Sequence, residues 1–260
     1  MIRLLVLFAL GAAGCGTLEG VPSADDGGAA GEAGADAGAD PYRQSVVNAG
    51  PLAYWRLDDA DGDPAKDEIG FANGTYSGGC THGVPGAQSG GRAVRFDGSS
   101  CRIDLGKEIP FLANAAYTIE AWASYDGDKD GYRHIFTNES RTNGAPTTGY
   151  ALLMTHPTAA LAERWPGGTR AEYMQLPTGF VHLVAVYDGS ALTLYVNGAV
   201  AQQTATSTMV TDPMSNAFIG ATVDHGAYGN YFGGVLDEIA VYDRVLSEDV
   251  IRSHYAQRRP

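Results

Sequence analysis

The sequence predicts an all-β protein, built as a sandwich of two packed antiparallel sheets with one short helix near the C-terminus. About a dozen short apolar stretches follow one another at intervals of roughly eight to twelve residues, as in sandwiches and barrels. No helical periodicity separates these stretches, which argues against alternating strands and helices. The 35 glycines among 260 residues are about twice the usual share and favour tight turns. With 44% hydrophobic residues, the chain can build one sizeable core.

Each expected strand is a short run of β-branched, aromatic and aliphatic residues that ends at turn residues. In chain order the strands are 52–57, 93–96, 101–105, 117–122, 134–137, 150–154, 181–187, 192–196 and 199–201. The clearest hairpin joins 181–187 to 192–196 through Asp188-Gly189, a pair that favours tight turns because glycine accepts positive φ. Alternation then places Leu192, Leu194 and Val196 on one face of the sheet.

Residues 247–256 form the one expected helix. Ser247 is a favourable N-cap, and Glu248 and Asp249 place negative charge in the first turn, where the helix dipole favours it. No other segment combines a cap with a helical apolar face.

The N-terminus predicts export. Residues 1–14 contain one arginine and an apolar run too short to span a membrane, which is typical of a signal peptide. Small residues directly precede Cys15, and this arrangement resembles the lipobox of bacterial lipoproteins, although Ala12 stands where that motif usually has leucine. The resemblance implies that Cys15 is lipidated and becomes the mature N-terminus. The alternative is an ordinary cleaved signal that happens to lie near a cysteine.

A flexible tether is expected after the anchor, so that 15–40 comprises the lipidated cysteine and the tether. Residues 16–40 contain seven glycines, seven alanines and six acidic residues, with no basic residue. Such a segment buries too little apolar surface to offset its ordering entropy. Gly16 after the cysteine resembles the sorting signal for the outer membrane of Gram-negative cells. The prediction is a folded domain at 41–260, held at the cell envelope by its lipid.

Charge and cysteine content restrict the partners and the covalent chemistry. A net charge of −13 argues against a nucleic-acid partner, since phosphate binding relies on clustered lysine and arginine. With Cys15 assigned to lipid, Cys80 and Cys101 remain as a pair in an exported, oxidising setting. They are expected to form a disulfide, with two buried free thiols as the alternative.

Several motifs resemble successive strands of the laminin-G-like, concanavalin A-like lectin/glucanase domains. They are L-A-Y-W-R-L-D-D at 52–59, F-D-G-S-S-C-R-I-D-L at 96–105, Y-T-I-E-A-W at 117–122, H-L-V-A-V-Y-D-G-S-A-L-T-L-Y-V-N-G at 182–198, F-I-G-A at 218–221, and the final strand and helix at 232–251. The resemblance covers residues 51–256 in the family's order and implies a jelly-roll sandwich. Because each motif chiefly encodes strands and turns, it says little about the ligand.

Two acidic sets are candidate Ca²⁺ sites. Asp126, Asp128 and Asp130 alternate as in the opening of a calcium loop, but the closing glutamate is missing because Thr137 occupies that position. A solvated acidic turn is the alternative. Members of the resembled family often tie their first and last strands together with a structural Ca²⁺. The resemblance implies that the matching ligands here are Asp67, Asn73 and Asp237.

Ligand binding is expected from aromatic side chains in loops. Sugar rings stack on aromatic faces while their hydroxyl groups bond to nearby polar side chains. The candidates are Trp165, Tyr125, Tyr132, Tyr173, Tyr231 and Arg133. The alternative is that most of these tyrosines cap the edges of the sandwich. Trp55 and Trp122 occupy strand positions and are expected in the core, and His182 is expected to be a hydrogen-bonded strand histidine.

Catalytic signatures are missing from the sequence. No E-x-D-x-x-E cluster of the related glucanases occurs, Glu120 stands alone in its strand, and no nucleophile elbow surrounds a serine. The six histidines show no metal-ligand spacing. We therefore expect a non-enzymatic lipoprotein that binds a glycan or a protein partner. The alternatives are a carbohydrate-active hydrolase or lyase with unrecognised carboxylates, and a structural component of the envelope.

Overall fold

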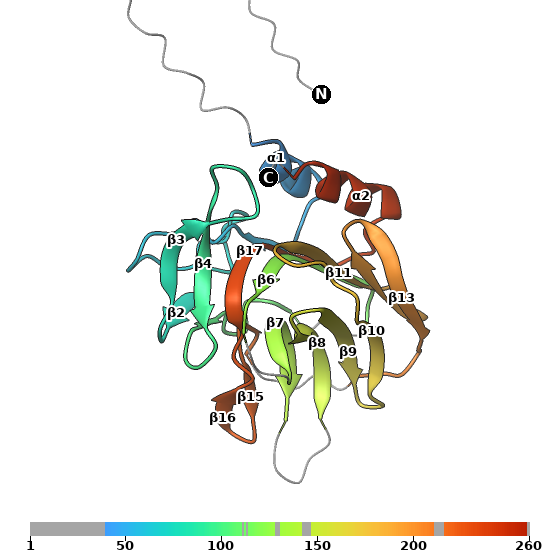
Figure 1. Cartoon of the computed structure of the whole chain (residues 1–260). Coiled ribbons are helices and arrows are strands. Elements are labelled where there is room, and N and C mark those ends of the chain that lie inside the picture. Colours follow the sequence, from blue (N-terminus) through green and yellow to red (C-terminus); the bar gives the residue numbers. More distant parts are fainter. Residues whose placement is uncertain are drawn as a thin grey trace, which may run out of the picture. The chain divides into compact units, whose positions relative to one another are not determined.

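In the computed structural model, two stacked β-sheets carry two short helices on one side (Figure 1). The structure describes residues 40–110, 112, 114–127, 131–141, 147–210 and 216–258. The predicted lipidation site Cys15 and two predicted calcium ligands, Asp128 and Asp130, lie outside these residues. Within them, no helix is long and apolar enough to cross a membrane.

The first sheet has eight strands, in the order β13-β12-β11-β6-β17-β4-β3, with β1 paired to the other end of β17. Every pairing between these strands is antiparallel. The strands are β1 Ala53–Trp55, β3 Thr81–Pro85, β4 Arg92–Asp97, β6 Tyr117–Tyr125, β11 Val181–Tyr187, β12 Ala191–Val196, β13 Ala199–Ala205 and β17 Gly233–Tyr242.

The second sheet has seven strands, in the order β10-β9-β8-β7-β14-β5-β2, and is also antiparallel throughout. A separate two-stranded hairpin follows β14 in the chain. The strands are β2 Thr75–Ser77, β5 Arg102–Asp104, β7 Arg133–Ser140, β8 Thr148–His156, β9 Ala159–Trp165, β10 Thr169–Tyr173 and β14 Phe218–Ile219, and the hairpin is β15 Thr222–Asp224 with β16 Ala227–Gly229.

Apolar side chains from the facing sides of the two sheets form the main core. Leu192, Leu194 and Val196 all enter this core, which confirms the predicted alternation of the hairpin strand β12. Trp55 is fully buried in the same core. The all-β, two-sheet antiparallel sandwich predicted from the sequence is therefore confirmed.

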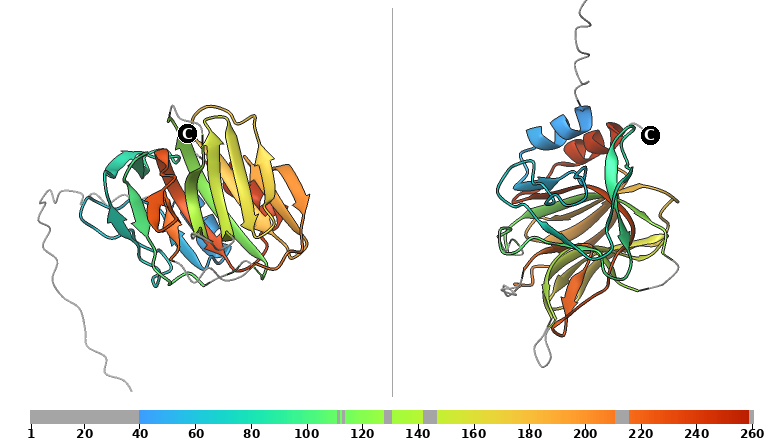
Figure 2. Two further views of the ribbon diagram at one scale, coloured as in Figure 1. Left: turned by 90° about the horizontal axis from the view of Figure 1, so that it is seen from below. Right: turned by 90° about the vertical axis from the view of Figure 1, so that its left-hand side faces the viewer.

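Two helices cover the outer face of the eight-stranded sheet (Figures 1 and 2). Helix α2 spans Glu248–Ala256, and the Ser247 hydroxyl accepts a hydrogen bond from the Val250 amide, so the predicted helix and its cap are confirmed. Trp122 is buried beneath the helices rather than between the sheets. Its predicted burial is correct, but it belongs to this second, smaller core.

The sequence prediction missed helix α1, Pro41–Asn48. Asp40 caps it by accepting a hydrogen bond from the Arg43 amide, and proline occupies its first turn, where a missing N–H costs nothing. The helix buries Tyr42 and Val46 against the sheet. Eight residues are too few for a stable isolated helix, so its stability comes from this packing.

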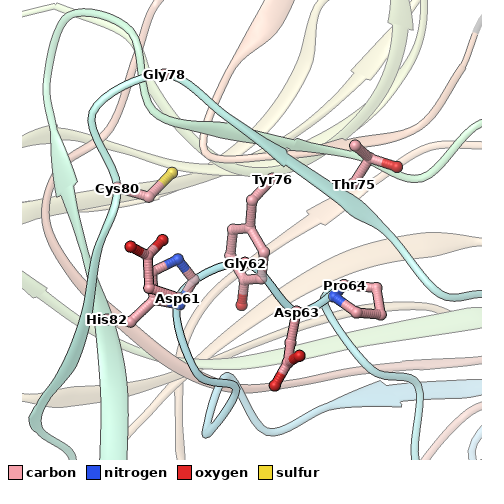
Figure 3. Close-up of a pocket in the computed structure, with 9 residues that line it drawn as sticks. All are labelled: Asp61, Gly62, Asp63, Pro64, Thr75, Tyr76, Gly78, Cys80 and His82. Atoms are coloured by element: carbon pink, nitrogen blue, oxygen red, sulfur yellow. The ribbon is translucent and has the colours of Figure 1, made fainter.

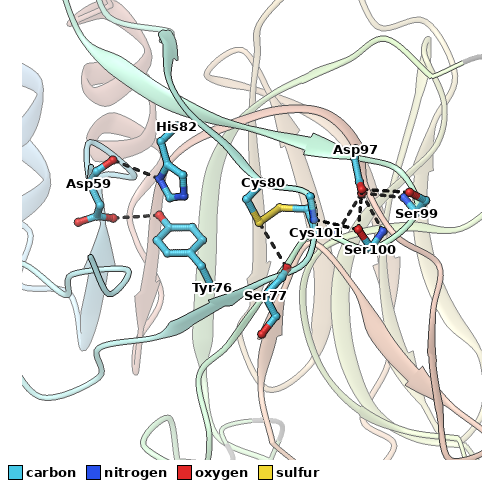
Figure 4. Close-up of a disulfide and its surroundings, with 10 residues drawn as sticks. Asp59, Tyr76, Ser77, Cys80, His82, Asp97, Ser99, Ser100 and Cys101 are labelled. Atoms are coloured by element: carbon cyan, nitrogen blue, oxygen red, sulfur yellow. Dashed lines mark hydrogen bonds between the residues drawn. A yellow bond between two sulfur atoms is a disulfide. The ribbon is translucent and has the colours of Figure 1, made fainter. Parts of the chain in front are cut away.

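The predicted disulfide joins Cys80, just before β3, to Cys101, just before β5 (Figure 4). Each of these strands belongs to a different sheet, so the bond links the two layers near one edge. Beside it, the Asp97 carboxylate accepts hydrogen bonds from the amides of Ser99, Ser100 and Cys101. These bonds fix the turn that leads into Cys101, and they hold the pKa of Asp97 well below its usual range against the opposing effect of burial.

Candidate functional site

The outer face of the seven-stranded sheet carries polar and aromatic side chains, and no helix of the described chain covers it. The cross-strand register places Thr137, Ala151, Glu163 and Arg170 in one row across β7, β8, β9 and β10. Neighbouring strand residues point the other way into the main core, as Leu152 and Ala162 do. On this face charged residues lie beside a small buried apolar cluster of Ala151, Leu153 and Leu161.

Five charged or titratable side chains gather on this face. Glu139 and Glu163 are fully buried, and an arginine lies between them: the Arg141 Nη2 donates to Glu139 Oε2 at 3.0 Å and to Glu163 Oε1 at 2.8 Å. The Arg170 Nε donates to Glu163 Oε2 at 3.3 Å. The His134 Nε2 lies 3.5 Å from Glu139 Oε2. The two carboxylates are thus balanced by two guanidinium groups, and an imidazole lies beside them.

Two aromatic rings border the charged group. The Tyr132 ring lies 5.6 Å from the Arg141 guanidinium and 5.5 Å from that of Arg170, and its hydroxyl accepts a 2.9 Å hydrogen bond from Arg170. The Trp165 ring lies 5.5 Å from the same Arg170 group and is partly exposed. We call these seven residues the outer-face site: Tyr132, His134, Glu139, Arg141, Glu163, Trp165 and Arg170.

The pKa values of the two glutamates of the outer-face site are shifted in opposite directions. Burial alone raises the pKa of Glu139, but its interactions with His134 and Arg141 outweigh burial and lower it below the ordinary value. Burial, together with the charge of Glu139, raises the pKa of Glu163. An ionised carboxylate and one that binds a proton more readily therefore lie side by side.

The predicted ligand-binding residues lie at several separate sites in the structure. Trp165 and Tyr132 enter the outer-face site. Tyr125 and Arg133 line a cleft of about 350 Å³ at the rim of the sandwich, together with Arg95 and with Asp126, one of the predicted calcium ligands. Arg95 and Asp126 form an ion pair in this cleft.

Tyr125 differs from its expected loop position, because it ends strand β6. It is only 8% exposed, and its ring packs on Phe232 with 5.7 Å between ring centroids. Tyr173 lines a cleft of about 360 Å³ with Val200. Tyr231 is half-buried and lines neither of these two clefts.

Another cleft, of about 440 Å³, lies between the 61–64 turn and strands β2 and β3 (Figure 3). Asp61 and Asp63 are exposed on one side of it, and Tyr76 and His82 form an edge-to-face pair on the other. The Tyr76 hydroxyl donates to Asp59 at 2.9 Å, which fixes the ring (Figure 4). Polar and apolar groups line this cleft to a similar extent, and none of its described lining residues is lysine or arginine.

The predicted structural calcium ligands have other partners. The Asp67 carboxylate accepts hydrogen bonds from the main-chain amides of residues 54, 69, 70, 71 and 72, and its own amide donates to the Asn73 side chain. Asp237 is buried, and one of its oxygens accepts a hydrogen bond from the Ala87 amide. Burial raises the pKa of Asp237 to about 8. The calcium site stays a prediction.

Sequence reasoning missed most of the charged part of the outer-face site. His134 and Glu139 come from β7, and Glu163 comes from β9, two strands away in the sheet. A bulge between His134 and Phe136 shifts the alternation, so His134 shares the outer face with Glu139 although the two are five residues apart. The only signal available in the sequence was the presence of glutamates inside otherwise apolar strands.

The fold and this site define a lectin-like β-sandwich. The chain belongs to the concanavalin A-like lectin/glucanases superfamily, whose Laminin_G_3 model matches residues 97–252. The predicted family resemblance is thereby confirmed. Comparison with curated proteins finds no match.

Solved structures support the fold at low sequence identity. Domain 4 of AbnA, a GH43 extracellular arabinanase from Geobacillus stearothermophilus, in complex with arabinotriose, is 18% identical with a TM-score of 0.55, over 79% of this chain and 98% of that domain. The receptor binding domain of botulinum neurotoxin D is 11% identical with a TM-score of 0.60, over 81% of this chain and 53% of that one. Trypanosoma rangeli sialidase in complex with the inhibitor DANA is 14% identical with a TM-score of 0.55, over 79% of this chain and 32% of that one. The chain thus spans about half of the toxin domains that it matches.

Proposed function

We propose that this protein is a non-catalytic binding module that recognises a carbohydrate through the outer-face site. The observation that carries the proposal is the pairing of the partly exposed Trp165 ring with the Arg170 guanidinium, 5.5 Å apart, on the sheet face without helices. An aromatic face can stack on a sugar ring while an adjacent guanidinium donates to its hydroxyl groups. The arabinotriose complex of the similar AbnA domain supports this class of ligand.

A panel of glycans and polysaccharides tests the proposal with the full-length chain. Trp165→Ala should weaken binding at least about fivefold, because truncating an anchoring aromatic costs more than about 1 kcal/mol. Tyr173→Ala, which removes an aromatic ring from a different cleft, is the matched control and should leave binding unchanged. Equal losses of glycan binding in both variants, or no glycan binding by the wild type, would contradict the proposal. Either result would favour a protein partner or a structural role in the envelope.

The same panel, run in Ca²⁺ and again in EDTA, tests the predicted calcium. If the metal is structural, EDTA should lower the melting temperature and leave ligand specificity unchanged. Asp237→Asn should remove the effect of EDTA on the melting temperature. Asp126→Asn tests in the same way whether the rim cleft binds Ca²⁺. A melting temperature that is the same in both buffers would contradict the prediction.

A second candidate function is glycoside hydrolysis, and the opposite pKa directions of Glu139 and Glu163 favour it. A carboxyl group with a raised pKa beside one with a lowered pKa is the pair that glycosidases use. For catalysis, substrate would have to displace Arg141 from between the two carboxylates. Sugar release by the wild type that both Glu139→Gln and Glu163→Gln abolish would favour the enzyme, whereas binding without product release favours the module.

We also propose that the module is displayed on the cell envelope as a lipoprotein anchored through Cys15, at the outer membrane of a Gram-negative cell. The sequence of residues 12–15 and the acidic, glycine-rich segment 16–40 support this proposal. Globomycin, which blocks processing of lipoprotein signals, should cause an unprocessed precursor to accumulate. Unchanged processing, or normal membrane retention of a Cys15→Ser variant, would contradict lipidation.

A further inference from the structure

The outer-face site contains a nitrogen and two carboxylate oxygens that converge on one point. One ligand atom each from His134, Glu139 and Glu163 lies within 4.8 Å of the other two, and all three side chains are buried. Metal–ligand distances near 2.0–2.2 Å place the donors of one ion about 3–4 Å apart. Side-chain shifts of about 1 Å, together with the departure of the Arg141 guanidinium, therefore suffice to close the set around an ion.

His134 gives an independent reason to expect a ligand at this point. Its side chain is fully buried, and neither of its ring nitrogens has a hydrogen-bond partner among the described residues. The nearest carboxylate oxygen lies 3.5 Å from Nε2. A buried imidazole normally bonds through both nitrogens, and leaving them without partners is unfavourable. The arrangement is explained if a ring nitrogen serves as a metal ligand.

We propose that His134, Glu139 and Glu163 bind one divalent transition-metal ion of the zinc or cobalt kind. One imidazole with two carboxylates is a nitrogen–oxygen set that suits these ions, and three protein ligands leave a fourth position open to water or to a ligand hydroxyl. The imidazole argues against Ca²⁺, which takes oxygen ligands. The inference goes beyond glycan recognition and does not depend on it.

Arg141 competes with the ion for the same oxygens. Its guanidinium bridges Glu139 and Glu163 at 3.0 and 2.8 Å, so it supplies the positive charge that a metal would supply. The side chain is 15% exposed, and the Tyr132 ring, 5.6 Å away, offers the displaced guanidinium a second contact. Metal binding therefore exchanges one cation for another between the two carboxylates.

The test uses the full-length chain with Cys15→Ser, so that no free thiol binds the metal, and without a histidine tag. Titration with Co²⁺ alone should give one equivalent of bound metal with a visible absorption band, and Zn²⁺ should remove that band. His134→Ala should lose at least the roughly 10- to 100-fold in affinity that even outer partners of metal ligands contribute. His156→Ala, an exposed histidine on the adjacent strand β8, is the matched control and should bind as the wild type does.

Arg141→Gln separates the proposal from a simple failure to fold. Removing the competing charge should raise the Co²⁺ affinity about tenfold, a gain that an unfolded chain cannot produce. Absence of Co²⁺ binding by the wild type, or equal affinity in His134→Ala, would overturn the site. Unchanged affinity in Arg141→Gln would overturn the proposed exchange of cations. None of these readouts depends on a glycan, so failure of the metal site and failure of glycan binding are distinguishable.

Discussion

On the outer face of each sheet, buried glutamate lies near histidine. The groups that hydrogen-bond to the glutamates or pair with their charge differ between the two clusters. Under the helices, Glu120 accepts hydrogen bonds from Tyr42 of α1 and Tyr242 of β17 at 3.1 and 3.0 Å. His182 and His254 bond to the same carboxylate at 2.7 and 2.9 Å. We call these five residues the helix-side cluster. On the opposite sheet, Glu139 and Glu163 are balanced by arginines that reach solvent, and neither ring nitrogen of His134 has a hydrogen-bond partner among the described residues.

The difference separates a cluster that joins elements of the fold from one that is balanced by arginines in contact with solvent. Every contact of Glu120 comes from an element that packs on its strand, so the carboxylate ties α1, α2, β11 and β17 to β6. The outer-face site draws its charge balance from Arg141 and Arg170, which can move without unfolding an element. Each histidine of the helix-side cluster bonds to Glu120 through one ring nitrogen, whereas neither ring nitrogen of His134 has a hydrogen-bond partner among the described residues.

Glu120→Ala should give the largest effect. It removes the common acceptor of the helix-side cluster and leaves four donors buried without it, which costs about 3–5 kcal/mol of unfolding free energy. Urea denaturation measures the loss. Glu248→Gln, which removes a surface ion pair with Arg252 on α2, is the control and should change stability by less than about 0.5 kcal/mol. A loss of under 1 kcal/mol in Glu120→Ala would contradict the structural role.

The pH dependence of stability should come from the helix-side cluster. Burial alone lowers the pKa of His254, but the charge of Glu120 outweighs it, so the folded-state pKa lies above the ordinary value near 6.5. A raised folded pKa contributes stability that is complete below pH 6.5 and is lost as pH rises through the folded value. Glu120 has a lowered folded pKa despite burial, because both histidines favour its charge, so its contribution is lost in acid, below about pH 4.

Melting temperature measured against pH checks this prediction. The wild type should lose stability on both sides of a plateau, and His254→Gln should lose the alkaline decline while keeping the acid one. If stability declines equally at alkaline pH in the His254→Gln variant, a titratable group other than His254 causes the decline.

Glu163→Gln should sharpen the contrast, with a smaller effect on stability and a large one on binding. The change leaves Arg141 and Arg170 without one charged partner, but both side chains reach solvent, so the expected loss of unfolding free energy is about 1–2 kcal/mol. Glycan binding and Co²⁺ binding should both weaken. A stability loss as large as that of Glu120→Ala would show that both clusters are structural.

Tyr42→Phe should have the smallest effect. It removes one of the hydrogen bonds to Glu120 and keeps the packing of the ring, so it should cost about 1 kcal/mol. Hydrogen exchange should show the loss at α1 and leave the seven-stranded sheet unchanged. Equal loss of protection in both sheets would mean that α1 is required for the whole sandwich.

Local patterns predicted most of the strands and the terminal helix. The run 181–187 coincides with β11, and Ser247 caps α2 as expected, because hairpin turns and helix caps are decided by residues close together in the chain. Helix α1 was missed because its stability depends on burial of Tyr42 and Val46 against a sheet that forms far away in the sequence. His182 was predicted to be a hydrogen-bonded strand histidine, and its Nε2 lies 2.7 Å from the Glu120 carboxylate, while Nδ1 has no hydrogen-bond partner among the described residues.

The sequence by itself determined the all-β class, the order of the strands, the pair of cysteines and two of the aromatic residues of the outer-face site. Only the tertiary structure decided which charged residues meet. Glu139 and Glu163 lie on strands separated by β8, and a one-residue bulge turns His134 toward them. Sheet order and bulges set such contacts over long separations in sequence, whereas patterns in a sequence report only on neighbours along the chain.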